Sequence, residues 1–215
     1  MKVEHAAHGV SLYLELPTIF LAALFGAAFF SARGMSAVGV LGIGLVFGLG
    51  GGIWRDVILN IEPAAFDYWY FVPVALAGAL VGGLLRTRYT SETTTRWLRN
   101  LVTALLLLIG LEKAHSYQNP AISIVLIGVI TAVGGTLTVG ILTRVDMFGH
   151  AGGAYLALCL LTASVVFLAI GYFDLVAAAE IAAALVFILL RVLGNRRGWT
   201  VPHLPGEYVP AEVTD

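Results

Sequence analysis

The chain has 215 residues, of which 59% are hydrophobic and only 12% are charged, and its mean hydropathy is +0.92. Soluble domains usually carry about 25% charged and about 45–50% apolar residues, so the composition predicts an all-α integral membrane protein. The formal net charge of −1 offers no basic stripe, and we expect no nucleic-acid partner. The single cysteine, Cys159, permits neither an intrachain disulfide nor a thiolate metal site.

Seven apolar segments are long enough to cross a bilayer, which takes roughly 20 mostly apolar residues. They lie near residues 13–32, 36–60, 69–87, 97–115, 120–143, 151–172 and 174–194. The N-terminus carries Glu4 and Glu15 and lacks the basic region of a signal peptide, so we interpret the first segment as a retained helix. Residues 195–215 are polar and rich in proline, and we expect a mobile tail there.

Basic residues are distributed unevenly between the two sides of these segments. Arginines gather in the odd-numbered connections and after the last segment, at Arg33, Arg86, Arg88, Arg96, Arg99, Arg144, Arg191, Arg196 and Arg197. Because cytoplasmic loops collect Lys and Arg, we expect the N-terminus outside and the C-terminus in the cytoplasm. This orientation requires an odd number of spans, which agrees with seven.

The sequence contains an internal repeat, because residues 34–52 align without a gap on residues 118–136, an offset of 84. Glycines coincide at three places: Gly44 with Gly128, Gly50 with Gly134, and Gly51 with Gly135. The repeat unit holds three spans, so we expect the second copy to be inverted relative to the first. We therefore expect a single membrane domain, which consists of repeat one over about 13–87, repeat two over about 97–172 and an added helix over about 174–194.

The glycine triplet Gly50, Gly51 and Gly52 predicts a kink or break in the second segment, since each glycine costs about 1 kcal/mol relative to alanine in a helix. Backbone groups freed in a bilayer need protein or water as partners. Glycine-interrupted segments in corresponding positions of two halves point to the working site of a transport protein. A second interpretation is that such glycines only let helices approach closely.

The second copy of the motif holds Gly134 and Gly135, with hydroxyl groups close by. Thr131, Thr136 and Thr138 offer oxygens that could line a pathway or could satisfy local backbone groups.

Arg55 and Asp56 follow the triplet inside an apolar segment. An arginine near the bilayer centre costs about 2.5–3.5 kcal/mol and needs a partner or water. Neighbours in sequence do not face each other on a helix, so we expect these two to have different partners, as part of a pathway or gate, or as interface anchors. Glu112 and Lys113, near the end of the fourth segment, either line the pathway or mark the outer interface.

These features together resemble the TRIC (trimeric intracellular cation) channels over about residues 13–193. The features that carry this resemblance are the two three-helix repeats, the Gly-Gly-Gly-x-x-Arg-Asp motif at 50–56, the second Gly-Gly pair at 134–135 and the seventh helix. The chain is most similar to the prokaryotic relatives, which are linked to the bacterial glycine transporter domain family. Lys113 followed by Ala114 looks like the lysine that those proteins carry in span 4. The second Arg-Asp pair of many relatives is absent here, where Val139 and Gly140 stand.

The resemblance implies a homotrimer in a prokaryotic plasma membrane, with one pore through each protomer. It implies that kinked spans 2 and 5 line that pore and that monovalent cations, chiefly potassium, pass through it. We expect no cofactor apart from the permeant monovalent cation and a bound membrane lipid.

Three functions stay open from the residues alone. The first is a cation channel, and the second is a carrier of a small zwitterion such as glycine, in which Arg55 holds the carboxylate. The third is a lipid-binding or scaffold protein that uses the basic loop 86–99. We do not expect an enzyme, because no nucleophile–base pair or metal-ligand pattern occurs.

Overall fold

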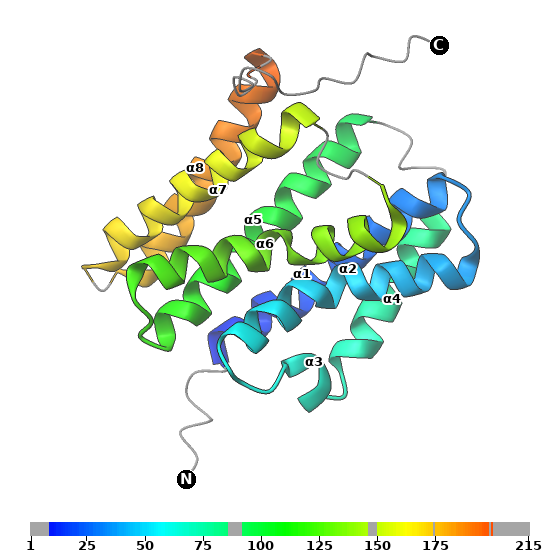
Figure 1. Ribbon diagram of the computed structural model, residues 1–215, viewed down its shortest axis with the longest axis horizontal. Coiled ribbons are helices and arrows are strands. Elements are labelled where there is room, and N and C mark those ends of the chain that lie inside the picture. The colour runs from blue at the N-terminus through cyan, green and yellow to red at the C-terminus, as the bar shows by residue number, and fades with distance from the viewer. Residues whose placement is uncertain (1–8, 86–91, 146–149, 174, 198, 200–215) are drawn as a thin grey trace.

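The structure is a computed structural model that describes residues 9–85, 92–145, 150–173, 175–197 and 199. Within these residues the chain forms eight α-helices (Figure 1). Their bounds are α1 Gly9–Ala32, α2 Ala37–Ile58, α3 Ala64–Asp67, α4 Phe71–Leu84, α5 Glu92–Ser116, α6 Ala121–Thr143, α7 His150–Gly171 and α8 Val176–Arg197.

The seven longer helices coincide with the seven predicted segments, and the four-residue helix α3 lies between α2 and α4. Among the described residues, four stretches are long and apolar enough to cross a membrane: Tyr13–Ala32, Ala37–Ile58, Ala121–Thr143 and Val176–Arg197. Helix α8 continues to Arg197, so the tail that we predicted from residue 195 begins later. The rest of that predicted tail, apart from residue 199, lies outside the described residues.

The helices pack in two groups, α1 to α4 and α5 to α8, which meet mainly where α2 packs against α6 and α1 packs against α5. Helix α1 packs against α4 and α2, α7 packs against α8, and α5 packs against α6. Figure 1 shows α2 and α4 on one side of the molecule, α7 and α8 on the other, and α5 and α6 between them. The main apolar core draws residues from both groups, such as Phe30, Phe47, Leu107, Phe167 and Phe187.

Local geometry recurs at the 84-residue offset that the glycines indicated. Helices α2 and α6 begin 84 residues apart, at Ala37 and Ala121. Positive φ angles also come in two pairs at this offset: Gly34 (80°) with Gln118 (55°), and Asn60 (54°) with Arg144 (56°). The turn before α2 is closed by Met35 N–H donating to Phe30 O, and the turn before α6 by Asn119 N–H donating to Ala114 O. The repeat therefore includes the turns that flank α2 and α6.

The predicted break at the glycines does not occur as unwinding. Helix α2 continues through Gly50, Gly51 and Gly52, and α6 continues through Gly134 and Gly135. The physical reason is that Gly50, Gly51, Gly134 and Gly135 lie where the two helices cross, so packing against a neighbouring helix compensates for the low helix propensity of glycine.

Candidate functional site: a buried charge cluster beside the crossing of α2 and α6

The two helices cross with their backbones in close contact at the repeated glycines. A Cβ atom placed on Gly50 would lie 3.1 Å from Gly135 Cα, and one on Gly134 would lie 3.3 Å from Gly51 Cα. A Cβ on Gly51 would clash with the carbonyl oxygen of Thr131, and one on Gly135 would lie 2.5 Å from the carbonyl oxygen of Phe47. A side chain at Gly51 or Gly135 would therefore require the two backbones to move apart, which matches our second interpretation of the motif.

A hydrogen bond adds to this crossing. Trp54 Nε1 donates to Thr138 Oγ1 over 3.0 Å, and these two residues stand 84 apart in sequence. The equivalent residues of the two repeats therefore meet directly at the crossing.

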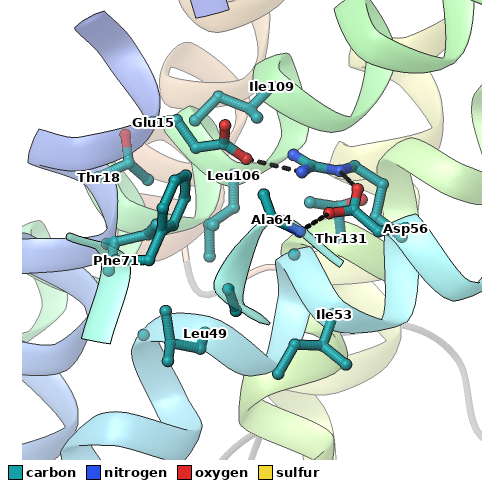
Figure 2. A pocket seen from close by; sticks show the side chains of 15 residues that line it. Glu15, Thr18, Leu49, Ile53, Asp56, Ala64, Phe71, Leu106, Ile109 and Thr131 are labelled. Carbon is teal, nitrogen blue, oxygen red and sulfur yellow. Dashed lines mark hydrogen bonds and ion pairs between the residues drawn. The ribbon is translucent and has the colours of Figure 1, made fainter. Parts of the chain in front are cut away.

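Three ion pairs form one cluster beside the crossing. Arg55 Nη2 lies 2.6 Å from Glu15 Oε1, and Arg55 Nε lies 2.7 Å from Asp56 Oδ1. Lys113 Nζ lies 3.0 Å from the same Asp56 oxygen. Figure 2 shows the carboxylates of Glu15 and Asp56 with dashed lines that mark their hydrogen bonds and ion pairs. The cluster thus joins α1, α2 and α5.

Asp56 also holds helix α3 in place. Its second oxygen, Oδ2, accepts a hydrogen bond of 3.1 Å from the backbone N–H of Ala64, the first residue of α3. Both oxygens of this carboxylate are therefore satisfied, which is what a buried charge requires.

The cluster is buried and electrically balanced. Arg55 and Asp56 are each 1% exposed, and two cations face two carboxylates. Bringing such ions out of water costs several kcal/mol each, and only close opposite charges and hydrogen bonds offset that cost. Charged groups kept inside apolar helices at this expense usually serve a pathway or a gate.

Our expectation that Arg55 and Asp56 have different partners is wrong in one respect. They do bond each other, because the long arginine side chain bends back to the next residue. They also have the separate partners that we expected, Glu15 for the arginine and Lys113 for the aspartate.

Sequence reasoning missed the role of Glu15. It is an acidic residue in the first predicted segment, and intramembrane charges of that kind are functional candidates by default. That signal was present in the sequence, but we used it only to argue against a signal peptide. That Glu15 is the partner of Arg55 became evident only from the packing of α1 against α5 and α2.

A small cavity lies against the cluster. Its volume is about 20 Å³, and the residues that line it include Glu15, Thr18, Arg55, Asp56, Phe71 and Thr131. That is space for one water molecule, because a site needs roughly 10–15 Å³ to hold one. Figure 2 shows Thr18 and Phe71 on the same side as Glu15.

The remaining predicted residues divide into two groups. The hydroxyls of Thr131 and Thr138 donate to backbone oxygens of Ile127 and Gly134, at 2.6 Å and 2.8 Å. Within the described part of the chain, Glu112 is half-buried and forms no ion pair, and Thr136 is half-buried without a hydrogen bond from its side chain. The cluster therefore contains Arg55, Asp56 and Lys113 of the predicted set, but not Glu112.

In the described residues, no group of three or more His, Cys, Asp or Glu side chains is placed to hold a metal ion. The chemistry of this site is that of paired, buried charges.

Comparisons with known proteins bear on both the domain and the fold. The family model described as "Glycine transporter" matches residues 12–87, a range that contains Glu15, Arg55 and Asp56. No curated protein sequence matches the chain significantly.

Solved structures of TRIC channels match nearly the whole chain. One, from work on conductance through TRIC cation channels, has a TM-score of 0.79 at 23% identity and covers 93% of this chain and 100% of that one. The TRIC orthologue from Rhodobacter sphaeroides has a TM-score of 0.79 at 23% identity and covers 88% and 99%. A prokaryotic TRIC channel in 0.5 M KCl has a TM-score of 0.76 at 18% identity and covers 89% and 98%. The chain has the fold of the TRIC channels.

Proposed function

We propose that the protein is a membrane channel for monovalent cations, including potassium, and that the Glu15–Arg55–Asp56–Lys113 cluster gates its pathway. The observation that carries this proposal is the buried, balanced set of four charges beside a helix crossing. The TRIC fold supports it, since the similar proteins are cation channels.

We also infer that the two halves are related by a two-fold axis, as inverted repeats. The contacts at the crossing are reciprocal: Gly51 meets Thr131, and the residues 84 positions away, Gly135 and Phe47, meet each other. A two-fold operation exchanges the members of such a pair. Helices α2 and α6, which cross on this axis, are the elements that we propose line the pathway of each protomer.

An arginine in a cation pathway would repel the permeant ion if its charge stood alone. Here the guanidinium of Arg55 contacts two carboxylates, so its charge is offset within the protein. Lys113 is less tightly held, because among the described residues its ammonium bonds one oxygen, Asp56 Oδ1, and its side chain is 12% exposed. We therefore assign to Lys113 the movable positive charge of the gate.

The cavity at the cluster has a volume of about 20 Å³, so the described conformation represents the closed state in this proposal. Opening requires that Lys113 leave Asp56, which exposes a carboxylate oxygen to the permeant cation.

A carrier for a small zwitterion is the second candidate, because the matching family model is described as a glycine transporter. The geometry favours it less. The guanidinium that would hold a substrate carboxylate already bonds Glu15 and Asp56, and the adjoining cavity has space for a water molecule rather than an amino acid.

We further propose that the chain assembles as a homotrimer in a prokaryotic plasma membrane, with its N-terminus outside and its C-terminus in the cytoplasm. The distribution of arginines supports the orientation, and the similarity to a protein described as a trimeric channel supports the trimer.

The function is tested with purified protein in liposomes, by measuring potassium flux and glycine exchange side by side. We expect potassium flux, and we expect Lys113→Met to raise it at least about tenfold. A unit charge at about 4 Å contributes roughly 4 kcal/mol at an effective dielectric constant of about 20, and 1.4 kcal/mol is a factor of ten. Lys113→Arg, which keeps the charge, is the matched control. Glycine exchange without potassium flux would overturn the channel in favour of the carrier.

A further inference from the structure

Helix α3 covers the cavity beside the charge cluster. Its residues Ala64 and Ala65 line that cavity together with Phe71, the first residue of α4. Ala65 is only 9% exposed, whereas the next residue, Phe66, is 72% exposed. A short helix of four residues therefore separates the cavity from the surface on this side of the molecule.

Helix α3 is held to the rest of the protein by few hydrogen bonds. Among the described residues, one such bond joins it to another helix: the N–H of Ala64 donates to Asp56 Oδ2 over 3.1 Å (Figure 2). The backbone bonds from Phe66 N–H and Asp67 N–H stay within the segment, since both reach Pro63 O. The carboxylate of Asp56 is therefore placed to act as the latch of α3.

The backbone on both sides of α3 is irregular. Asn60 has a left-handed φ of 54°, and Pro63 precedes α3 with extended backbone angles. Tyr68, which follows α3, is extended as well, with φ −111° and ψ 116°. A few loop residues of this kind are what a moving segment uses as hinges. Helix α3 can thus move as a unit between residues 59–63 and 68–70.

The second repeat is built differently at this point. Residues 68–70 separate α3 from α4, but their equivalents 84 positions later, residues 152–154, lie inside the continuous helix α7. The break between α3 and α4 therefore belongs to the first repeat, which is also the repeat that carries Arg55 and Asp56.

Asp56 connects the latch to the ion pairs of the cluster. Its Oδ1 accepts from Arg55 Nε and Lys113 Nζ, while its Oδ2 accepts from Ala64 N–H. A carboxylate is a rigid planar group, so any rotation that follows a movement of Lys113 also displaces the oxygen that holds α3.

We propose that α3 is a lid over the end of the pathway at which α2 stops, and that Asp56 latches it shut through the backbone N–H of Ala64. The pathway in this statement rests on the proposed channel function. The covering of the cavity and the latch rest on the contacts of α3 alone, so they can be tested without ion flux.

The latch is tested with Ala64→Pro, which removes the N–H and places a ring carbon where Asp56 Oδ2 lies. Proline otherwise suits the first residue of a helix, and the extended backbone of Pro63 suits the residue before a proline. The readout is the rate at which a cationic methanethiosulfonate modifies Ala65→Cys in purified Cys159→Ser protein. We expect Ala64→Pro to raise this rate at least about tenfold, since a hydrogen bond to a charged group is worth about that factor.

Two controls separate the latch from other effects. Ala64→Ser keeps the N–H and should leave the rate at Ala65→Cys within about twofold. Phe66→Cys, which replaces an exposed side chain, should react equally fast with and without Ala64→Pro. Equal acceleration by Ala64→Ser, or an unchanged rate in Ala64→Pro that unfolds at the wild-type temperature, would overturn the latch.

A second variant loosens the hinge and leaves every bond of Asp56 in place. Pro63→Gly frees the fixed φ before α3, and we expect it to raise the rate at Ala65→Cys by about two- to fivefold. It decides the question if Ala64→Pro does not fold, because an unchanged rate in Pro63→Gly would then overturn the lid.

Potassium flux in liposomes tests whether the lid closes the pathway. In a Lys113→Met background, Ala64→Pro should raise the flux further, whereas Ala64→Ser should not. Faster modification of Ala65→Cys with unchanged flux would overturn α3 as a lid of the pathway. If no variant conducts potassium, the channel function fails, while faster modification still supports the latch.

Discussion

Arg55 connects the charge cluster, because its guanidinium bonds Glu15 and Asp56 at the same time. Replacing it by methionine would leave two buried carboxylates facing Lys113 alone. Removing one partner from a buried ion pair typically destabilises by about 3–5 kcal/mol, and we expect Arg55→Met to lower the free energy of unfolding by that amount. Chemical unfolding of the purified protein in mixed micelles measures it.

The control for Arg55 is Arg33→Met, which removes an exposed arginine and should change the stability by less than about 0.5 kcal/mol. Arg55→Lys should fall between the two, since an ammonium keeps the charge but lacks the planar fork that spans both carboxylates. Wild-type stability in Arg55→Met would show that the cluster does not hold α1 and α2 together. Because loss of Arg55 weakens the fold, Lys113 is the better residue for testing conduction.

At the scale of the element, the glycines of the triplet differ in what surrounds them and therefore in why glycine is needed. A Cβ on Gly51 would clash with the carbonyl oxygen of Thr131 on α6, whereas a Cβ on Gly52 meets only Arg55 Nη2, at 3.9 Å. We expect Gly51→Ala to push α2 and α6 apart and to destabilise by about 1–3 kcal/mol, as overpacking does. Gly52→Ala should be neutral or stabilise by up to about 1 kcal/mol through helix propensity.

Thermal unfolding in detergent compares these two variants, with Gly42→Ala as a further control, since Gly42 lies in α2 with open space around it. If Gly51→Ala and Gly52→Ala proved equally harmful, the triplet would act by bending α2 rather than by close packing.

The sequence was enough to predict the elements, but not the contacts between them. Hydropathy located the seven longer helices because each needs a long apolar stretch. The charge cluster escaped prediction because the partners of Arg55 and Asp56 come from α1 and α5, 40 and 57 residues away. The glycine repeat was recognised, but propensity alone suggested a break where tertiary packing keeps both helices continuous.

At the scale of the whole molecule, the reciprocal contacts at the crossing connect fold and function. Trp54 bonds Thr138, its own equivalent in the other repeat, so the proposed two-fold axis passes beside the crossing and close to the charge cluster. The symmetry ends at the charges, since Val139 and Gly140 replace Arg55 and Asp56 in the second repeat. The first repeat therefore supplies three of the four charges, Glu15, Arg55 and Asp56, and the second repeat supplies Lys113, while both halves supply the scaffold.

The inverted repeat makes a prediction about equivalent turns. Arg33 precedes α2 and Tyr117 precedes α6, 84 residues later, and both side chains are exposed. If the halves are inverted, these residues lie on opposite sides of the membrane. Each is replaced by cysteine in a Cys159→Ser background, which removes the single native thiol. We expect a membrane-impermeant maleimide added to intact cells to label Tyr117→Cys but not Arg33→Cys, and inside-out vesicles to give the reverse. Labelling of both from the same side would contradict the inversion and, with it, the proposal that α2 and α6 cross on a two-fold axis.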